Sequence, residues 1–503
     1  MADQKLLLVL RQGPKVWNRY REENPDAGDL DLSLADLAGL DLRGANLRSV
    51  NLSGANLTGT RLDGAELTDC RLTRVQAQEA SFDHATLIRA RMAGARLPQA
   101  SFVEANLSGA DLSRANLTES RLRRANFVGA TLPRVNASRA SMDGAKLSDT
   151  DLTCAVLSGA NLEGAHLTGA KLAGARLSMA NLRGADLARA EAPDAHLWKA
   201  VLYEANLTGA IFTGADLAEA DLSYAQMLHA GFDGARLEKS RMIRADLSNA
   251  TLKGACLRDA DLSKTILSRA NLTEAELIRT KLGGAKLEGC QLSRALVVDC
   301  DLEQADLTDC RFDDVVLSGF HGEGIRASNL SLTPADEAGL LVDDLEMVQL
   351  MEALFMKSRW RDLFAARSLR LVLVLGSFAG WRRDHLDRLR EVLRLRGYVP
   401  VVIDLENRVG RKLREGIGNL AHLARFMIAD LAGSREFVGH IRTFGLAIRT
   451  LPLQSIVPEG EDFIEIPGVP AQEPYRYKDT EHLIETFDEC VLHPIEEKLE
   501  AVS

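Results

Sequence analysis

The chain has 503 residues and carries 61 Lys and Arg against 71 Asp and Glu, a net charge of −10. This length predicts two or more folded units, and the low aromatic content of 5% indicates a core built mostly from aliphatic side chains. The N-terminal sequence lacks the basic start and the cleavage pattern of a signal peptide, and no apolar run is long enough to span a membrane. A cytoplasmic protein without a membrane or nucleic-acid partner is therefore expected.

Residues 1–29 are expected to form an N-terminal helical cap. Apolar side chains spaced for a short helix over residues 5–22 are Leu6, Leu7, Leu10, Val16, Trp17 and Tyr20. The chain that follows is repetitive, and the first turn of a stacked repeat exposes unpaired backbone groups. We expect the helix to cover that end.

From residue 30 onward, a bulky apolar residue recurs at every fifth position. The series runs from Leu32 to Leu317 without an insertion, and Leu, Phe, Met or Val fills 55 of its 58 positions. The residue two places earlier is usually small. Such a register is typical of a solenoid. Only Ala77, Ala137 and Ala192 depart from it, and we expect a local irregularity at the last two, each of which has a proline nearby.

A five-residue period fits neither a helix nor a flat strand. Five residues turn an α-helix by about 500°, so the series cannot line one helical face. Along a strand, an odd step would send successive Leu side chains to opposite faces. The backbone must therefore turn a corner in every repeat. Gly44 and Gly54 suit tight corners, and the Asn of Ala45-Asn46-Leu47 is suited to hydrogen-bonding the turn.

The motif Ala-(Asp/Asn)-Leu-x-x, repeated throughout residues 31–320, resembles the pentapeptide-repeat family. The resemblance implies a right-handed quadrilateral parallel β-helix with four repeats in each coil. At this ratio, 58 repeats make roughly 14 coils, and stacked strands about 4.8 Å apart make a rod of about 70 Å. We assign residues 30–332 to this solenoid.

Some members of that family protect type II topoisomerases by imitating the negative surface of DNA. Residues 31–320 contain 37 Asp and Glu against 33 Lys and Arg, a net of four negative charges. Duplex DNA of the same length would carry about 40 negative charges. The nearly neutral rod therefore disfavours topoisomerase protection by DNA mimicry.

The charges are unevenly distributed along the predicted rod. Residues 71–140 hold 11 Arg against 5 acidic residues, whereas residues 301–320 are mostly acidic. The candidate interaction residues are Arg121, Arg123, Arg124, Arg134 and Arg139 in the basic stretch and Asp301, Glu303, Asp306, Asp309, Asp313 and Asp314 in the acidic stretch. These charges either keep the rod solvated or join the basic patch of one molecule to the acidic end of another, in self-association or with a protein partner.

Four cysteines, Cys70, Cys290, Cys300 and Cys310, occupy the small inward position that Ala usually holds. A thiol is tolerated there as a small apolar group. Residues ten apart fall on opposite sides of a four-sided coil, so the last three cysteines are not spaced as metal ligands. We expect no metal and no bound cofactor.

Residues 333–368 are expected to form a connecting helix that also caps the last coil. Thr333 and Pro334 have the order typical of a helix start. Apolar residues between Leu341 and Phe355 then recur at intervals of three and four.

Residues 369–503 are predicted to form a small α/β domain. Strands are expected at Leu371–Leu375, Val399–Ile403, Phe426–Ala429 and Leu453–Val457, with helices at 384–396 and 413–423. This alternation predicts a doubly wound, flavodoxin-like sheet. Ligands of such sheets bind beyond the carboxyl ends of the strands. Candidate ligand-binding residues there are Gly376, Ser377, Arg382, Asp404, Glu406, Asp430 and His440, although the acids among them also suit helix caps.

Three segments make residues 371–495 similar to the TIR-like domains fused behind pentapeptide repeats in bacterial proteins: VLGSFAGWRRDHLDRLREVLRLRGYVPVVID, LAHLARFMIADL and EPYRYKDTEHLIETF. The resemblance implies a protein-interaction or sensing module in bacterial signalling or defence. Related TIR domains and nucleoside deoxyribosyltransferases cleave N-glycosidic bonds with a glutamate on the helix after the third strand. At that place this chain has His440, and Glu436, one helical turn earlier, is the candidate catalytic residue.

Two functions remain open from the sequence. In the first, the chain is a non-catalytic interaction scaffold whose rigid rod displays the TIR-like module. In the second, that module is an NAD or nucleoside N-glycosidase, with NAD as a substrate. The displaced glutamate and the lack of a catalytic motif in the repeats favour the scaffold.

Overall fold

The structure, a computed structural model, describes most of the chain. The described residues are 3–25, 30–332, 340–342, 345, 348, 370–376, 381–404, 420–421, 424–430, 451–461 and 473–502. The chain divides into two compact units. Unit 1 comprises Met1–Lys286, Asp299–Ala305 and His321–Glu323, and unit 2 comprises Leu287–Val298, Asp306–Phe320 and Gly324–Ser503.

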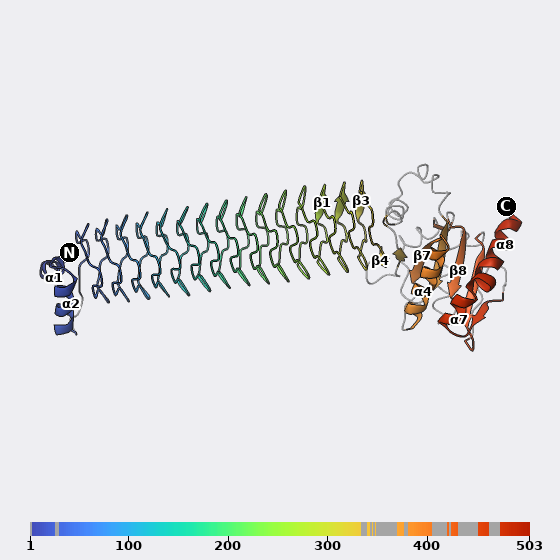
Figure 1. The fold of residues 1–503 in the computed structure, drawn as a ribbon, viewed down its shortest axis with the longest axis horizontal. Helices are drawn as coiled ribbons and strands as arrows, with labels where there is room; N and C mark the ends of the chain where they lie inside the picture. The colour runs from blue at the N-terminus through green and yellow to red at the C-terminus, as the bar shows by residue number, and fades with distance from the viewer. Residues whose placement is uncertain are drawn as a thin grey trace. The chain divides into compact units, whose positions relative to one another are not determined.

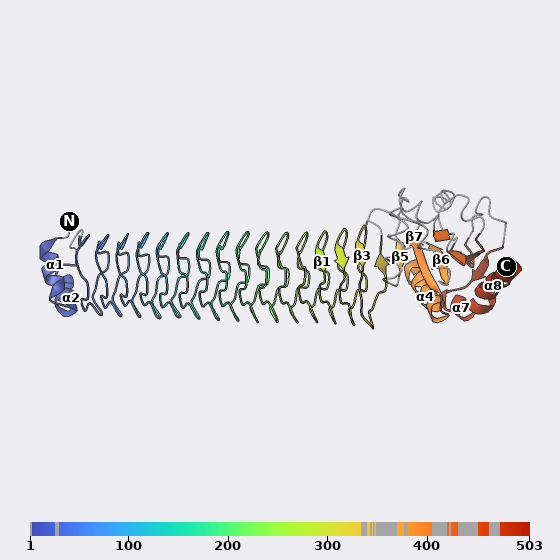
Figure 2. The same ribbon diagram turned by 90° about the horizontal axis from the view of Figure 1, so that it is seen from above.

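Unit 1 is built from stacked coils of 20 residues. Parallel bridges join each outward residue to the one 20 positions later, beginning with Asp31 and Asn51. Backbone hydrogen bonds follow the same spacing, and the Leu32 amide donates to the Asn51 carbonyl at 2.8 Å. A coil therefore contains four five-residue repeats. The coils follow one another at regular intervals along one axis, as two perpendicular views show (Figures 1 and 2).

Each coil has four sides, one for each repeat. The Leu and the small residue two places before it are buried, and the bridge residue between them is exposed or half-buried. Side 1 carries Asp31 and Asn51, side 2 Asp36 and Asn56, side 3 Asp41 and Arg61, and side 4 Asn46 and Glu66, each continued at intervals of 20 residues. The two residues after each Leu form the corner to the next side. The second corner residue has a positive φ, for example 66° at Gly129 and 54° at Arg124.

The coils remain regular at the small-residue positions, so the predicted irregularity is wrong. The Ala137 amide donates to the Val156 carbonyl at 2.8 Å, and the Ala192 amide donates to the Ile211 carbonyl at 2.7 Å. The side chain of Ala77 is likewise fully buried. The ladder of backbone hydrogen bonds holds the path of the coil whether the inward position carries Leu or Ala.

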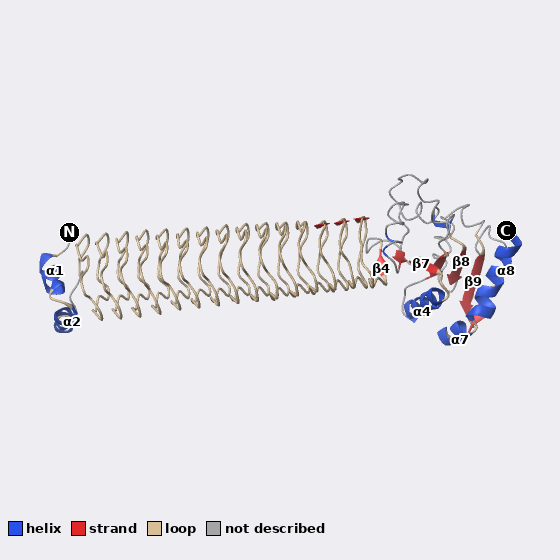
Figure 3. Ribbon diagram, turned by 45° about the horizontal axis from the view of Figure 1, so that its top comes forward, coloured by secondary structure: helices blue, strands red, loops and turns tan. Residues whose placement is uncertain are grey.

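Most coil residues lie in turns and isolated bridges, and three repeats form short strands (Figure 3). These are β1 (Glu276–Ile278), β2 (Leu296–Val298) and β3 (Val316–Ser318). Strand β2 pairs in parallel with β3. The 20-residue bridges outlast the Leu register, because Arg311 still bridges to Ser331.

The N-terminal segment forms two helices, α1 (Gln4–Arg11) and α2 (Pro14–Glu23), where one helix over residues 5–22 was predicted. The chain breaks at Gly13, whose φ is 102°. Pro14 disfavours a helical conformation at the residue before it but suits the first position of a new helix. The Asp3 carboxylate caps α1 by accepting from the Lys5 amide at 2.8 Å.

Helix α2 contacts the first coil. The Trp17 side chain is fully buried, and its indole N–H donates to the Asn46 carbonyl at 2.7 Å. Asn18 donates to the Gly44 carbonyl at 2.9 Å and accepts from the Asn46 amide at 2.7 Å. These bonds satisfy backbone groups that no preceding coil is present to pair.

Unit 2 contains a seven-stranded sheet in the order β10-β9-β8-β6-β7-β5-β4. Its strands are β4 (Leu330–Ser331), β5 (Leu340–Val342), β6 (Leu371–Gly376), β7 (Val399–Asp404), β8 (Phe426–Asp430), β9 (Leu453–Pro458) and β10 (Tyr475–Tyr477). Strands β6 to β10 are parallel, with β6 between β7 and β8. Taken in chain order, these five strands are arranged 2-1-3-4-5, the order of flavodoxin-like sheets.

Strand β5 corrects the expectation of a helix throughout residues 333–368. Leu341 pairs with Val402 of β7 in antiparallel register. An apolar run of three residues fits a helix or a strand, and the free edge of β7 offers it backbone partners. Leu345 and Val348 are helical and buried. The remaining residues of the predicted helix lie outside the described part of the chain.

The described helices of unit 2 share one hydrophobic core with the sheet. They are α4 (Trp381–Leu395), α7 (Thr480–Glu485), the π-helix η3 (Asp488–Leu492) and α8 (His493–Val502). Val372 and Val374 of β6 pack with Leu386 of α4 and Phe487 in this core. The intervening residues of β6 are buried as well. Most of the helix predicted at 413–423 lies outside the described residues.

Candidate interaction surfaces

Three predicted ligand-binding positions come together at the carboxyl edge of the sheet. Gly376, Asp404 and Asp430 end the adjacent strands β6, β7 and β8, and Gly376 pairs in register with Asp404. Arg382 lies in α4, the helix after β6. The other four predicted residues, Ser377, Glu406, Glu436 and His440, lie outside the described part of the chain.

Two of these positions are buried. A side chain at Gly376 would place its Cβ 2.7 Å from Leu386 Cδ1, so glycine allows α4 to pack against β6. Asp430 is only 1% exposed. Neither residue presents a polar group to solvent in this structure.

The five predicted basic residues do not form one patch. Arg121 is a bridge residue of side 3, and Arg123 and Arg124 form the corner between sides 3 and 4. Arg139 lies at the corner between sides 2 and 3, whereas Arg134 lies at the corner between sides 1 and 2. A turn every five residues distributes neighbouring positions around the coil, and this corrects the single patch expected from the sequence.

The predicted acidic residues are distributed in the same way. Asp306 is a bridge residue of side 4, Asp309 lies at the corner between sides 4 and 1, and Asp313 lies at the corner between sides 1 and 2. Asp306 lies 3.7 Å from Arg326. Asp301 is a bridge residue of side 3. The acidic stretch therefore surrounds the coil and does not concentrate on one face.

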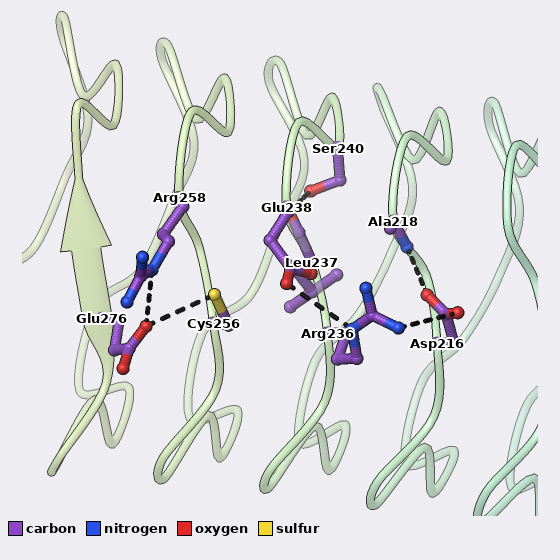
Figure 4. Close-up of polar contacts among 9 residues, drawn as sticks. All are labelled: Asp216, Ala218, Arg236, Leu237, Glu238, Ser240, Cys256, Arg258 and Glu276. Atoms are coloured by element: carbon purple, nitrogen blue, oxygen red, sulfur yellow. Dashed lines mark hydrogen bonds and ion pairs between the residues drawn. The ribbon is translucent and has the colours of Figure 1, made fainter.

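Several of the charged side chains pair with a residue of an adjacent coil. The basic residues form the ion pairs Arg123–Asp143 at 3.6 Å, Arg124–Glu104 at 3.6 Å and Arg139–Glu119 at 3.7 Å. On side 2, Arg236 donates to Asp216 at 3.3 Å and lies 3.5 Å from Glu238 (Figure 4). Arg258 donates to Glu276 at 2.7 Å. Each exposed pair contributes at most about 1 kcal/mol, so these ladders serve solubility and register more than stability.

One ladder residue predicts an acid-sensitive contribution to stability. Two hydrogen bonds from Arg43, at 2.8 and 2.6 Å, lower the pKa of Asp41 to about 2. A carboxyl whose pKa is lower in the folded state stabilises the fold above its unfolded pKa, and this contribution is lost as the pH falls through the folded pKa. We expect Asp41→Asn and Arg43→Gln each to flatten the dependence of unfolding free energy on pH between about pH 4 and pH 2. Denaturant titrations at several pH values across that range measure the unfolding free energy. The prediction would be contradicted if both variants kept the pH dependence of the natural chain.

A different kind of surface lies on side 3. Between residues 31 and 320 the chain has one Trp and two Tyr, and all three fall between residues 198 and 224. With two exposed aliphatic neighbours they form the aromatic patch, defined as Met179, Trp198, Val201, Tyr203 and Tyr224. Four of these five side chains are exposed: Met179 by 63%, Trp198 by 37%, Val201 by 39% and Tyr224 by 42%. They belong to three consecutive repeats of side 3 and its two corners.

Cations of the same chain hold the rings of the aromatic patch. The guanidinium of Arg183 lies 4.9 Å from the Tyr203 ring centre, and the Lys199 amine lies 4.4 Å from that of Trp198. The Tyr203 and Tyr224 rings lie 5.3 Å apart. Rings that these contacts hold in position lose little conformational freedom on binding. Trp, Tyr and Arg are also the residues that dominate the binding energy of protein interfaces.

The comparisons with known proteins identify the coils. The sequence profile described as pentapeptide repeats matches residues 31–69, 70–109, 80–119, 110–149, 150–189, 200–238, 230–269, 255–294 and 285–320, more than half of the chain. The chain belongs to the pentapeptide-repeat family. Pentapeptide repeats imply a right-handed quadrilateral β-helix, in agreement with the parallel bridges and the four repeats of each coil.

Solved pentapeptide-repeat structures are similar to parts of the chain. HetL, involved in heterocyst differentiation regulation in the cyanobacterium Nostoc, is 31% identical over 47% of this chain and 90% of its own, with a TM-score of 0.27. A trypsin-treated form of QnrB1, a plasmid-mediated fluoroquinolone resistance protein, is 22% identical over 33% of this chain and 83% of its own, with a TM-score of 0.23. A pentapeptide-repeat protein of the Arabidopsis thaliana thylakoid lumen is 30% identical over 21% of this chain and 66% of its own, with a TM-score of 0.12. No curated protein matches the chain.

The inward cysteines of the pentapeptide repeats are packing residues. Cys70, Cys290, Cys300 and Cys310 are all buried, and the Cys70 thiol donates to the Val50 carbonyl at 3.0 Å. Burial raises the pKa of the Cys70 thiol well above its usual range. Within the described residues, no group of three or more His, Cys, Asp or Glu is placed to hold a metal ion. No helix in that part of the chain has the length and apolar character needed to cross a membrane.

The aromatic patch of this pentapeptide-repeat protein was not among the sites predicted from the sequence. The signal was present, because the only Trp and Tyr of the repeats occur close together at outward positions of the register. Inward positions of the coils admit Phe, as at Phe212 and Phe232, whose rings stack 5.5 Å apart. An aromatic residue outside the Leu register therefore has no packing role in the coil and needs another explanation.

Proposed function

We propose that this pentapeptide-repeat protein is a non-catalytic interaction scaffold. Its coils form a rigid support for protein contacts, and the α/β domain of unit 2 acts as a TIR-like interaction or sensing module in bacterial signalling or defence. The aromatic patch on side 3 carries the proposal. Exposed Trp, Tyr and Met side chains between ladders of paired charges have the composition of a protein interface, with an apolar centre and a polar rim.

The surface of the coils supports a protein partner over nucleic acid. Acidic and basic side chains alternate along the coils, as in the ion pairs Lys199–Glu219 at 3.3 Å and Arg183–Glu204 at 3.8 Å beside the aromatic patch. The coils therefore present neither the uniformly positive potential that attracts a phosphate backbone nor the uniformly negative potential that attracts a DNA-binding protein. The near-neutral repeats of residues 31–320 thus support protein contact and not DNA mimicry.

A second candidate function is an NAD or nucleoside N-glycosidase in unit 2. The strand order of the sheet and the meeting of Gly376, Asp404 and Asp430 at one edge favour this candidate, because ligands of such sheets bind at that edge. Glu436 would stabilise the positive charge that develops on the ribose as the base leaves. Asp430 is buried, so the reaction would depend on Glu436.

A base-release assay separates the two functions. The full chain at high concentration is incubated with NAD and, separately, with a deoxynucleoside, and released nicotinamide or base is measured. We expect no release above that of the Glu436→Ala variant. Release by the natural chain that Glu436→Ala abolishes would overturn the scaffold and establish the glycosidase.

A further inference from the structure

We infer that side 3 is an interface between two antiparallel copies of this chain, centred on the aromatic patch. The inference rests on the proposed scaffold function and names the partner as a second copy. Side 3 is a flat ladder of repeats in unit 1, and two such ladders meet face to face about a two-fold axis that crosses the coils. We place that axis between the repeats of Val201 and Asp221, where the exposed aromatic side chains lie.

This axis places large side chains of the aromatic patch opposite small side chains of the neighbouring repeat. Trp198 of one copy faces Ala218 of the other, the smallest side chain at that corner of the neighbouring repeat. Within each chain the Trp198 indole N–H donates to Glu219 at 3.4 Å, so the ring lies beside this corner of the neighbouring repeat. Tyr203 faces Ser223, a small residue at the corresponding corner of the neighbouring repeat. Each contact occurs twice, because the interface is symmetric.

The charges near the centre are complementary in the antiparallel arrangement. Lys199 of one copy faces Glu219 of the other, so the Lys199–Glu219 ion pair of each chain, at 3.3 Å, meets its counterpart with opposite charges facing. Glu204 faces Tyr224. With parallel copies, each bridge residue of side 3 would face itself, so that Asp221 would meet Asp221 and Arg241 would meet Arg241. Like charges directly opposed cost several kcal/mol, which favours the antiparallel arrangement.

The same axis joins the basic and acidic stretches of the sequence. Val201 faces Asp221, and the two copies run in opposite directions. The repeat four coils before Val201 on one copy therefore faces the repeat four coils after Asp221 on the other. Arg121 then faces Asp301, and Arg123 faces Glu303. All four belong to side 3 or its corner with side 4, and Arg121 and Glu303 are exposed. Of the acidic stretch, Asp301 and Glu303 take part in this contact, whereas Asp306, Asp309 and Asp313 lie on other sides.

Two like-charged pairs also occur, at the corner between sides 2 and 3. Arg139 faces Arg279, and Glu119 faces Asp299. The arginines already have partners in their own chain, because Arg139 lies 3.7 Å from Glu119 and Arg279 donates to Asp259 at 2.7 Å. These like-charged pairs lie at one corner of side 3, where solvent screens charges, whereas Arg121 and Asp301 are bridge residues in the middle of the side.

The size of the face suits a specific dimer. The repeats from Arg121 to Asp301 span nine coil spacings of about 4.8 Å, or about 43 Å. A side of five residues at about 3.3 Å each is about 16 Å wide. The product is about 700 Å² on each copy, close to the roughly 800 Å² per partner of a standard interface.

Charge exchange in the full chain tests the arrangement, with association measured by sedimentation velocity over a range of concentrations. We expect the natural chain to dimerise and Arg121→Glu to weaken the dimer at least tenfold. Arg121→Glu combined with Asp301→Arg should restore it, because each new Glu then faces a new Arg. Trp198→Ala should also weaken the dimer at least tenfold, while its melting temperature confirms an intact fold.

Arg134→Glu is the matched control, because Arg134 lies outside side 3 and should leave association unchanged. A natural chain that stays monomeric at every concentration would overturn the dimer but leave the scaffold proposal intact. A double variant no stronger than Arg121→Glu would overturn the antiparallel register. Base release by a dimeric chain would overturn the scaffold and leave the interface standing.

Discussion

Replacing Trp17 by Ala is expected to lower the free energy of unfolding by about 3–5 kcal/mol, the cost of removing a large aromatic side chain from a core. Trp17 is fully buried, and its indole N–H donates to the Asn46 carbonyl at 2.7 Å. The variant also uncovers backbone groups of the first coil, and exposed strand edges promote association between chains. Chemical denaturation measures the first effect, and light scattering after mild heating measures the second.

Two variants separate the contributions of Trp17. Trp17→Phe keeps most of the apolar area but loses the hydrogen bond, and leaving the Asn46 carbonyl unpaired should cost about 1–3 kcal/mol. Val16→Ala removes an exposed neighbour of the same helix and should change stability by less than about 0.5 kcal/mol. Equal losses in Trp17→Ala and Val16→Ala would show that α2 does not stabilise the coils.

Replacing Phe212 by Ala is expected to have a similarly large effect in the middle of the repeats, about 3–5 kcal/mol. Phe212 is fully buried, stacks on Phe232 at 5.5 Å and lies in the column of Ala192, where the inward side chain is already small. A cavity next to Ala192 has no larger side chain on that side to fill it. Denaturation of the full chain, followed by circular dichroism, measures the loss.

The neighbouring Ile211 provides the matched control for Phe212. Ile211 is 45% exposed on side 1, so Ile211→Ala should change stability by less than about 0.5 kcal/mol. Because each coil contacts only its neighbours, a local defect can also divide the unfolding of the coils into two transitions. Similar losses for Phe212→Ala and Ile211→Ala would contradict the inward and outward assignment of the register.

The coils could be predicted because their signal is local and repeated. Every fifth residue from Leu32 to Leu317 reports the same backbone geometry, so single departures such as Ala137 do not obscure it. The ladder of backbone hydrogen bonds also stays regular at these positions, where we expected an irregularity. A small side chain removes core contacts but no backbone hydrogen bond, and the hydrogen bonds define the coil.

The α/β domain shows where local patterns become insufficient. Buried strands such as Leu371–Gly376 stand out as apolar runs, and each of the four predicted strands ends one residue earlier than the observed one. Leu340–Val342 was expected in a helix, because apolar residues at intervals of three and four suit either structure over a short span. This segment is a strand because it pairs with β7, and β7 lies about 60 residues later in the sequence.

The aromatic patch and the charged residues make the same point for the candidate site. Arg134 and Arg139 are neighbours in sequence but occupy different corners, whereas Arg121 and Asp301 are far apart in sequence and share side 3. Trp198 and Tyr224 likewise approach one side only because successive coils stack in register. Counting charges along the chain could show that they are uneven but not which of them face a partner together.

By itself, the sequence determined the period of the coil, which side chains point inward and the presence of an α/β domain after the repeats, because each of these follows from the alternation of apolar and polar residues over short distances. Only the tertiary structure decided which outward residues share a side, how α2 meets the first coil and how the strands are ordered. Those features depend on hydrogen bonds between residues 20 or more positions apart, and a local pattern carries no record of its distant partner.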